Sequence, residues 1–349
     1  MCDYDFTDGS RIPIMPDVHA GKGCTIGTTM TVHNKVVPNI VGVDIGCGMY
    51  TVRLETLEID FAKLDEAAHF VPSGTNVWEG RQERFDLTRL RCYRSLRDTK
   101  RLERSLGTLG GGNHFIEVDD GTKYLVIHSG SRNLGKQVAE IYQQLAIDLS
   151  KGKETYFAER DAIIREYKAA GRRNEIQDAL KKIAWNERET SIPEDLCFLY
   201  GTYLEDYLFD VEICQEFARR NREKIAEILL DRAGLQGSDG FHTIHNYIDT
   251  REMILRKGAI AVHQGEKVLI PINMKDGSVL AIGKGNPEWN YSAPHGAGRI
   301  MFRRSAKERL NMEEYRVQMQ GIYTTSVCED TLDEAPMAYK SLEDIINVI

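Results

Sequence analysis

A helical block set between two stretches of strand-forming residues is the feature that most constrains the fold of this chain. Residues 11–55 are rich in Gly, Val, Ile and Thr, and TIGTTMTVHNKVVP alternates as β-strands do. From about residue 137 to residue 234 the composition changes to Glu, Lys, Ala, Leu and Arg, with apolar residues three and four positions apart. This block has room for three or four helices, and Gly234 suits the end of the last one.

Short strands return after the helical block. GAIAVHQGEKVLIPINMKDGSVLAIG contains a turn at Asp276 and Gly277, and SLEDIINVI predicts a short amphipathic helix. No linker rich in Pro, Ser or Gly separates the three parts. We therefore expect an α+β fold, in which a single domain over residues 1–349 has β-sheets around a central cleft and carries the helices of 137–234 as an insertion.

Composition and charge exclude several classes of protein. No apolar run approaches the about 20 residues that a membrane helix needs, so we expect no membrane partner. The segment MCDYDFTDGSRIPIMPD lacks the features of a secretory signal, so we expect a cytoplasmic protein whose seven cysteines are thiols. A net charge of −8 argues against nucleic acid covering the whole surface. Residues 81–104 hold nine Arg or Lys, which predicts either a local phosphate-binding patch or a solvated helix face.

The segment VGVDIGCGM, residues 41–49, places Asp44 and Cys47 among glycines, after an apolar run that we expect to be a strand. Four histidines have similar neighbours, which permit tight turns at strand ends: His114, His128, His245 and His295. A carboxylate, a thiolate and imidazoles form a mixed donor set that suits zinc, manganese, iron or cobalt, and a thiolate can bridge two ions. A two-metal centre of this kind suits phosphoryl or nucleotidyl transfer.

The neighbouring segments favour anions. GSRNLG offers Arg132, HGAGRIMFRR offers Arg299 and Arg303, and GGGNH offers unhindered backbone amides. The sequence has no Walker-type GxxxxGK[ST] motif, and GTLGGGNH has the wrong spacing for a dinucleotide-binding fold. These segments therefore predict a phosphate-handling metal site that differs from both common nucleotide-binding motifs.

Seven strings follow one another along the chain: MPDVHAGKG, VGVDIGCGM, LGGGNHFIEV, IHSGSRNLG, HNY, SAPHGAGR and DEAPMAYKSLEDI. Their order and approximate spacing resemble those of the RtcB family of RNA ligases, from near the N-terminus to the end. The resemblance implies an enzyme that uses GTP and two manganese ions to join an RNA 3′-phosphate, or 2′,3′-cyclic phosphate, to a 5′-hydroxyl, in RNA repair or tRNA splicing. It does not identify an activating protein partner.

The resemblance also implies roles for individual residues. Asp44, Cys47 and His114 would hold one manganese ion, and Cys47, His128 and His245 would hold the other. The nucleophile that becomes guanylylated would be His295. Contacts to the guanylate would come from Asn113, His114, Phe115, Ile116, Glu117, His245, Asn246, His295, Gly296, Ala297, Gly298 and Lys340. Phosphates would be bound by Arg132, Arg299 and Arg303.

Two features depart from the family. Tens of residues that usually precede MPDVH are missing, so we expect part of the RNA-binding surface or a sheet strand to be absent. A different segment, IPINMKDGSVLAIGKGNPEWNYSAP, replaces the expected Gly-Ser-rich nucleotide loop. The contacts of that loop to the ribose and guanine are therefore not carried over.

Three other interpretations stay open. A dinuclear metal phosphoesterase that opens cyclic phosphates or hydrolyses RNA ends would need the metal ligands but not His295. A catalytically silent RNA-binding or scaffold protein predicts lost ligands, whereas every motif ligand is present. A nucleophilic Cys47 with a histidine base would leave Asp44 and the other histidines unexplained.

Several further residues have weaker predictions. Asp17, His19 and Lys22 in PDVHAGKG either line a phosphate path or form a structural turn. Trp289 and Tyr291 are candidates for stacking on a nucleobase. The spacing of the aromatic residues in the helical block favours the core for Tyr200, Tyr203, Tyr207 and Phe209.

Overall fold

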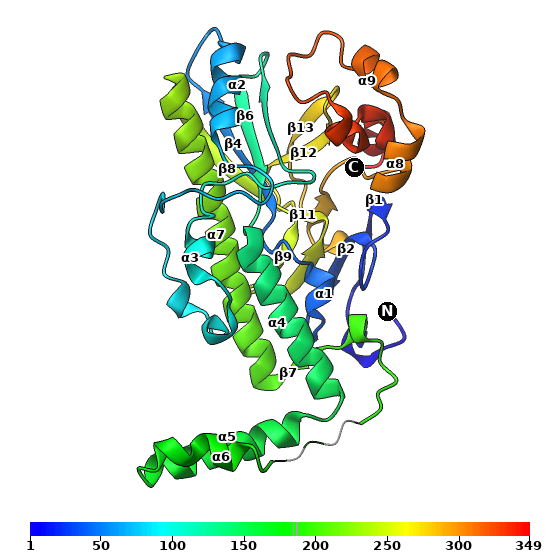
Figure 1. Cartoon of the computed structure of the whole chain (residues 1–349). Helices are drawn as coiled ribbons and strands as arrows, with labels where there is room; N and C mark the ends of the chain where they lie inside the picture. Colours follow the sequence, from blue (N-terminus) through cyan, green and yellow to red (C-terminus); the bar gives the residue numbers. More distant parts are fainter. Residues whose placement is uncertain (184, 186–187) are drawn as a thin grey trace.

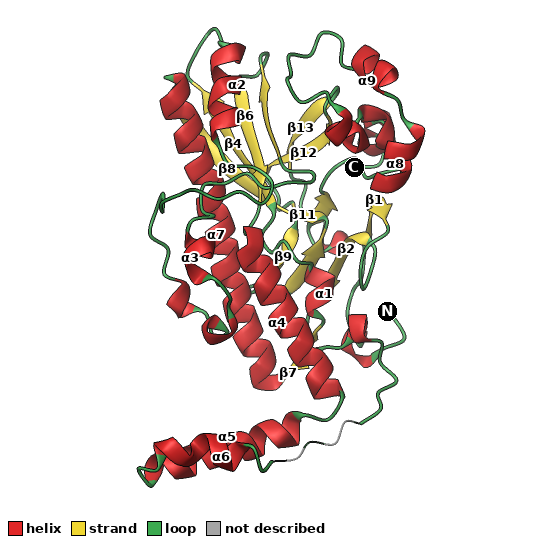
Figure 2. Cartoon of the chain, viewed as in Figure 1, coloured by secondary structure: helices red, strands yellow, loops and turns green. Residues whose placement is uncertain are grey.

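A computed structural model describes residues 1–183, 185 and 188–349 (Figure 1). Residues 184, 186 and 187 of the predicted helical block lie outside this description. The prediction of an α+β fold is confirmed, because long helices accompany several small β-sheets (Figure 2). Within the described part of the chain, no helix is both long and apolar enough to cross a membrane.

Two four-stranded antiparallel sheets form the centre of the molecule. The first contains, in spatial order, β1 (Ile14–His19), β2 (Ile26–Thr31), β10 (Ile254–Lys257) and β9 (Asn246–Asp249). The second contains β5 (Phe115–Asp119), β6 (Tyr124–Ser129), β4 (Gly48–Leu54) and β8 (Gly237–Ile244). Only His245 separates β8 from β9, so this residue lies where the chain passes from one sheet to the other.

Three smaller strand pairs complete the β-sheets that the described residues form. The predicted turn at Asp276 and Gly277 joins β12 (Lys267–Asn273) to β13 (Gly277–Ile282), and Gly277 has a positive φ of 70°. The other two pairs are β11 (Ala259–Ala261) with β14 (Ser292–Pro294), and β3 (Lys35–Val36) with β7 (Leu199–Tyr200). β14 ends directly before His295. Its pairing with β11 therefore fixes where the loop that begins at His295 starts.

The apolar run before Asp44 is not a strand, contrary to the prediction. It contains the short helix α1 (Pro38–Val41), which ends at Gly42 with a φ of 98°. Proline favours the first turn of a helix because its φ is already helical and its missing N–H is not needed there. This local effect outweighs the β propensity of the surrounding valines and isoleucines.

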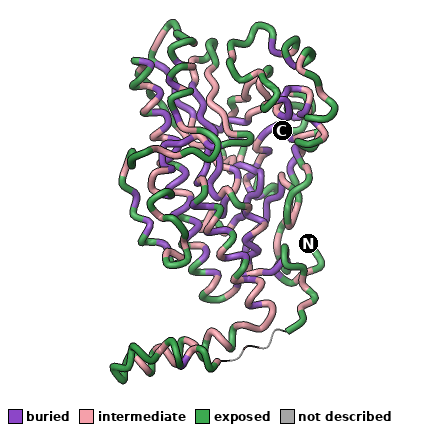
Figure 3. The backbone as a smooth tube through the Cα atoms, in the orientation of Figure 1, coloured by how far each residue is buried: buried purple, intermediate pink, exposed green. Residues whose placement is uncertain are grey.

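The predicted helical block begins at Arg132, and its described residues form four α-helices: α4 (Arg132–Ser150), α5 (Glu154–Ala169), α6 (Ile176–Leu180) and α7 (Gly201–Ala233). Gly234 ends α7 in the left-handed conformation, with a φ of 67°, as predicted. α5 and α6 project from the body as an arm (Figure 1), and most of their surface is exposed (Figure 3). α7 instead packs through the core, with Phe217 and Ile225 fully buried.

One aromatic residue of this block was predicted incorrectly. Tyr207 is fully buried and Tyr200 and Tyr203 pack partly against the core, as expected, but Phe209 is 37% exposed. Two positions along a helix turn a side chain about 200° from its neighbour, so Tyr207 and Phe209 face opposite sides. The ring of Phe209 lies against the guanidinium of Arg91 at 4.5 Å.

The remaining helices are short: α2 (Phe61–Phe70), α3 (Thr99–Glu103), α8 (Arg303–Arg309), α9 (Met312–Gln318) and α10 (Leu342–Ile346). α10 is the terminal helix that SLEDIINVI predicts. α8 and α9 lie beside the C-terminus, on the side of the molecule away from α2 and α7 (Figure 1). Buried residues of both central sheets and α7 form the core between these groups (Figure 3).

Candidate functional site

A cavity of about 2140 Å³ brings together loops from distant parts of the sequence. Most of the sequence-predicted site residues line it: Asp44, Asn113, His114, Phe115, Ile116, Glu117, His128, His245, Asn246, His295, Gly296, Ala297, Gly298, Arg299 and Arg303. Cys47, Arg132 and Lys340 are not among the residues that line it. Cys47 is buried directly behind the lining histidines.

Asp44 and Cys47 lie in the turn that joins α1 to β4. The Cys47 N–H donates to the carbonyl of Asp44 at 3.1 Å, and the Cys47 carbonyl accepts from the N–H of His245 at 2.9 Å. Glycine is required at position 48, because a Cβ there would lie 2.3 Å from the carbonyl oxygen of Thr243. The glycines of VGVDIGCGM therefore let this turn pack against the junction of β8 and β9.

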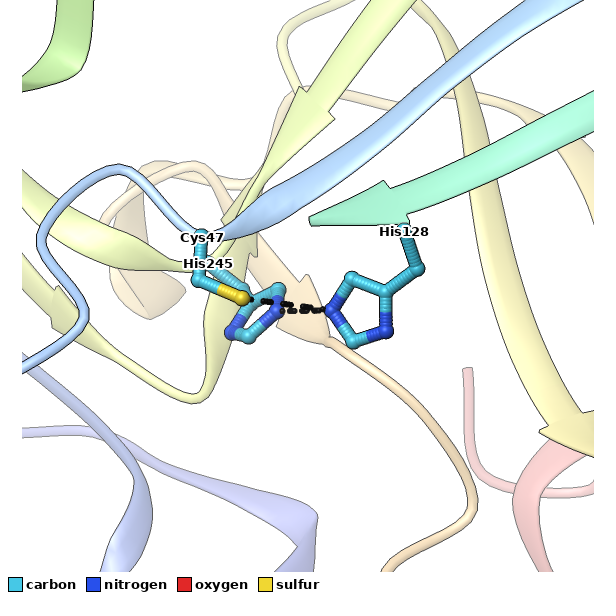
Figure 4. A group of neighbouring side chains, drawn as sticks. All are labelled: Cys47, His128 and His245. Atoms are coloured by element: carbon cyan, nitrogen blue, oxygen red, sulfur yellow. Dashed lines mark hydrogen bonds between the residues drawn. The ribbon is translucent and has the colours of Figure 1, made fainter. Parts of the chain in front are cut away.

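Cys47 belongs to two groups of metal-binding side chains. In the first, Cys47 Sγ lies 3.3 Å from His128 Nε2, which lies 3.0 Å from His245 Nε2 (Figure 4). In the second, Cys47 Sγ lies 3.4 Å from His114 Nε2, which lies 3.0 Å from Asp44 Oδ2. Within each group the donor atoms all lie within 4.8 Å of one another.

The side chains in these groups are prepared to bind a cation. The Nδ1 atoms of His114 and His128 bond to the carbonyls of Leu109 and Asn113 at 2.8 and 2.9 Å. Since a carbonyl can only accept, each Nδ1 carries a proton, and each Nε2 is the ring nitrogen that is turned toward Cys47 and would bind a metal. Asp44 Oδ1 is buried without a hydrogen-bond partner among the described residues. The donor set of oxygen, sulfur and nitrogen therefore fits a first-row divalent metal.

Burial controls the protonation of this cluster. Desolvation lowers the pKa of His128 and of His245 well below the usual value, with neighbouring histidines adding to the effect, so both imidazoles are neutral. Burial, followed by the charge of Asp44, raises the pKa of the Cys47 thiol well above its usual value. Formation of a thiolate at Cys47 consequently needs a compensating positive charge.

Two polar side chains from the middle of α7 support the loops around the cluster. Asn221 accepts from the N–H groups of Gly107 and Thr108 at 2.7 and 3.0 Å and donates to the carbonyls of Thr108 and Gly130. Arg222, which is 1% exposed, donates to the carbonyls of Gly46 and Ser129. Neither residue was predicted from the sequence. Polar residues within an amphipathic helix usually lie at the surface, so their spacing gave no signal.

His295 is held by a buried carboxylate from the other end of the chain. Its Nδ1 bonds to Asp17 Oδ2 at 2.6 Å, and its backbone N–H donates to the same oxygen at 3.2 Å. Asp17 is fully buried. The Nδ1 proton points at the carboxylate, so His295 Nε2 carries the free lone pair, while the ring centre lies 4.8 Å from that of His245. Of the two roles considered for Asp17, a structural turn and a phosphate path, neither anticipated this bond.

Of the residues expected to contact a guanylate, most line the cavity and Lys340 does not. Glu117 lies in the cavity wall, where burial raises its pKa, and accepts a hydrogen bond from Ser278 at 2.7 Å. Asn246 lines the cavity and accepts from the N–H of Gly258. The Lys340 ammonium instead donates to the carbonyl of Pro16 at 2.8 Å, outside the cavity lining.

The three arginines expected to bind phosphates already have protein partners. Arg132 donates to Thr108 Oγ1 and to the carbonyl of Gly74, behind the glycine-rich loop. Arg299 pairs with Glu334 at 3.2 Å, and Arg303 pairs with both Glu334 and Asp333. Arg299 and Arg303 line the cavity, but their charges are balanced there by these acidic residues.

The stacking candidates lie elsewhere. Neither Trp289 nor Tyr291 is among the residues lining the cavity, and the ring of Tyr291 packs on His263 at 5.0 Å. His19 and Lys22 do line the cavity; His19 bonds through Nδ1 to the carbonyl of Asp17, and Lys22 pairs with Asp195. The structure therefore leaves the cavity without these two predicted aromatic contacts.

The family model and the similar proteins that match this chain carry the same family name. Residues 9–87 and 92–349 match the family described as tRNA-splicing ligase RtcB. The chain is 30% identical to RNA-splicing ligase RtcB of Escherichia coli K12 over 386 residues, which cover 96% of this chain and 85% of that protein. It is 28% identical to tRNA-splicing ligase RtcB of Aeropyrum pernix over 406 residues, covering 96% and 83% of the two chains.

Proposed function

The chain belongs to the tRNA-splicing ligase RtcB family, and from this premise we propose that it joins an RNA 3′-phosphate or 2′,3′-cyclic phosphate to a 5′-hydroxyl. In this proposal, residues 1–349 act as one ligase domain in RNA repair or tRNA splicing in the cytoplasm. The observation that carries it is the position of His295, which Asp17 holds through Nδ1 and which lines the same cavity as the three histidines of the Cys47 cluster.

Two manganese ions would be held by the cluster. Asp44, Cys47 and His114 would bind one, and Cys47, His128 and His245 would bind the other, with Cys47 shared between them. The donor distances support this assignment, and so do the Nδ1 hydrogen bonds that turn Nε2 of His114 and of His128 toward Cys47. When bound, the ions would supply positive charge that offsets the repulsion between a nucleophile and the phosphates of GTP.

His295 would act as the nucleophile toward GTP. Its Nε2 forms a bond to the α-phosphorus, the bond to the β-phosphate oxygen breaks, and pyrophosphate leaves. Asp17 keeps the proton on Nδ1 and stabilises the positive charge that the ring gains. Glu117, at the cavity wall, offers a carboxylate acceptor to the N–H groups of guanine.

Two further transfers complete the reaction. The RNA 3′-phosphate takes the GMP from His295, which regenerates the imidazole and activates the RNA end. The 5′-hydroxyl of the second RNA end then attacks the activated phosphate, and GMP leaves as the new phosphodiester forms. A cyclic phosphate must first be hydrolysed to the 3′-phosphate.

A labelling experiment tests the proposal. The protein is incubated with manganese and α-labelled GTP, ATP or CTP and separated under denaturing conditions, beside His295→Ala and Cys47→Ala. The matched control is His263→Ala, which removes an imidazole outside the cavity lining. We expect label from GTP that requires His295 and Cys47 but not His263, and that is stable at neutral pH and lost in acid. Metal binding without label from any nucleotide would contradict the ligase mechanism and favour a metal phosphoesterase.

A further inference from the structure

Exposed apolar side chains gather at the cavity that holds His295. Seven of the exposed large apolar residues line it, including Val43, Ile300, Phe302 and Tyr323. Phe302 is 71% exposed and Ile300 is 59% exposed. Apolar groups clustered in water at one site indicate a surface that is covered when a partner binds.

Phe302 occupies a position where folding favours a different residue. It is the N-cap of α8, and its side chain makes no capping hydrogen bond. Ser, Thr, Asp and Asn are preferred at this position because their side chains accept from the free N–H groups of the first turn. A phenylalanine that is exposed to water and does not cap its helix contributes little to stability. Such a local conflict between sequence and fold marks a functional position.

The backbone around Ile300 and Phe302 is held firmly. The N–H of Ile300 donates to the carbonyl of Ala338 at 2.9 Å, and the carbonyl of Phe302 accepts from the N–H of Ala306. On either side, the guanidinium groups of Arg299 and Arg303 pair with acidic residues of the segment that follows α9. These contacts anchor the backbone on both sides of the two apolar side chains.

These side chains share a cavity with the reactive groups. Ile300 and Phe302 line the same cavity as His295, and the neighbouring Arg303 lies opposite the glycine-rich loop. A Cβ on Gly112 would come within 3.9 Å of Arg303 Nη2, and Gly112 is two residues before His114. Arg304, two residues after Phe302 in the first turn of α8, is 91% exposed and has only a surface ion pair with Glu308. An aromatic ring beside an available cation is typical of sites for single-stranded nucleic acid.

We propose that Ile300 and Phe302 form a stacking platform for an unpaired RNA base close to the ends that are joined. The inference rests on the proposed ligase function and extends it to the form of the substrate. An aromatic face accepts any base, so the platform selects unpaired ends without selecting sequence. RNA ends that are base-paired up to the junction cannot use it.

The test measures binding of a single-stranded RNA with a 3′-phosphate by fluorescence anisotropy. We expect Phe302→Ser to bind about tenfold more weakly, since stacking is lost, while its melting temperature stays equal or rises because serine caps α8. Phe302→Trp keeps an aromatic face and should bind like the natural protein. The matched control is Phe209→Ala, which removes a phenylalanine that is 37% exposed but not among the cavity-lining residues.

A scan with abasic nucleotides identifies the base that stacks. Abasic sites are placed in turn at the three positions nearest each RNA end. If Phe302 stacks one of these bases, one abasic RNA loses affinity for the natural protein but binds Phe302→Ser no worse than the intact RNA does. Two results would overturn the proposed platform. One is an RNA affinity of Phe302→Ser within twofold of that of the natural protein, and the other is a loss of affinity for the abasic RNA that is equally large in Phe302→Ser. Guanylylation and ligation by the natural protein, measured alongside, show separately whether the proposed function itself fails.

Discussion

Replacing Asp17 by asparagine should slow the guanylylation of His295 by about two orders of magnitude. The asparagine has the same shape, but it has no charge and can present either its oxygen or its amide nitrogen to His295 Nδ1. The natural carboxylate fixes the proton on Nδ1 across a 2.6 Å bond and leaves Nε2 free. With asparagine, part of the population presents N–H to Nδ1, which moves the ring proton to Nε2 and blocks the nucleophile.

The magnitude follows from two contributions. Hydrogen bonds to charged groups contribute about 1.5–3 kcal/mol, against about 0.5–1.5 kcal/mol for neutral ones, so the charge-assisted bond is worth about 1.5 kcal/mol more. As Nε2 bonds to phosphorus the ring becomes positive, so the bond then joins two charged groups, and charge-assisted bonds are roughly twice as strong as neutral ones, which adds about another 1.5 kcal/mol. Together they give about 3 kcal/mol, and each 1.36 kcal/mol is tenfold in rate.

The assay is a single-turnover measurement of label transfer from α-labelled GTP to the protein without RNA. Asp210→Asn is the matched control, because Asp210 is also fully buried and accepts hydrogen bonds from Cys92 N–H and Tyr142. We expect this control to lower the melting temperature while folded protein keeps its labelling rate. A labelling rate within threefold of the natural protein for Asp17→Asn, with manganese binding intact, would refute the role assigned to Asp17.

Three further predictions concern the metal cluster and its support. Cys47→Ser should weaken manganese binding at least about 100-fold, since the shared thiolate is lost; two ions bound with unchanged affinity in a calorimetric titration would contradict this. Asn221→Ala removes the acceptor of the buried N–H groups of Gly107 and Thr108 and should lower the free energy of unfolding in urea by about 3 kcal/mol; a loss below about 1 kcal/mol would show that water replaces the side chain. Burial, followed by the charge of Arg222, lowers the pKa of His242 to about 4, so the unfolded chain binds a proton that the folded chain does not between pH 6.5 and 4. Stability should therefore fall as the pH drops through this window, by up to roughly 3 kcal/mol, and His242→Gln should flatten the urea-unfolding profile; parallel profiles would contradict the assignment.

The sequence determined the features that depend on neighbours along the chain. The alternation of strand residues, the helical spacing and the composition change predicted an α+β fold, and Gly234 and Gly277 lie where a helix end and a turn were expected. Two local predictions were wrong. Pro38 begins a helix in a run that resembled a strand, and Phe209 has an aromatic side chain at a helical spacing but faces away from the core.

Tertiary structure alone decided which of the predicted residues meet. Asp17 and His295 are 278 positions apart and bond because β1 and the turn after β14 pack together. Packing of other remote segments places Cys47 in two groups of metal-binding side chains and pairs Arg299 and Arg303 with acidic residues from a later segment. The spacing of residues in the sequence indicates which face of a helix or strand a side chain occupies. The distances between remote segments depend instead on how whole elements pack. A sequence motif can therefore identify a metal-binding or hydrogen-bonding side chain, but only the tertiary structure determines which groups that side chain contacts.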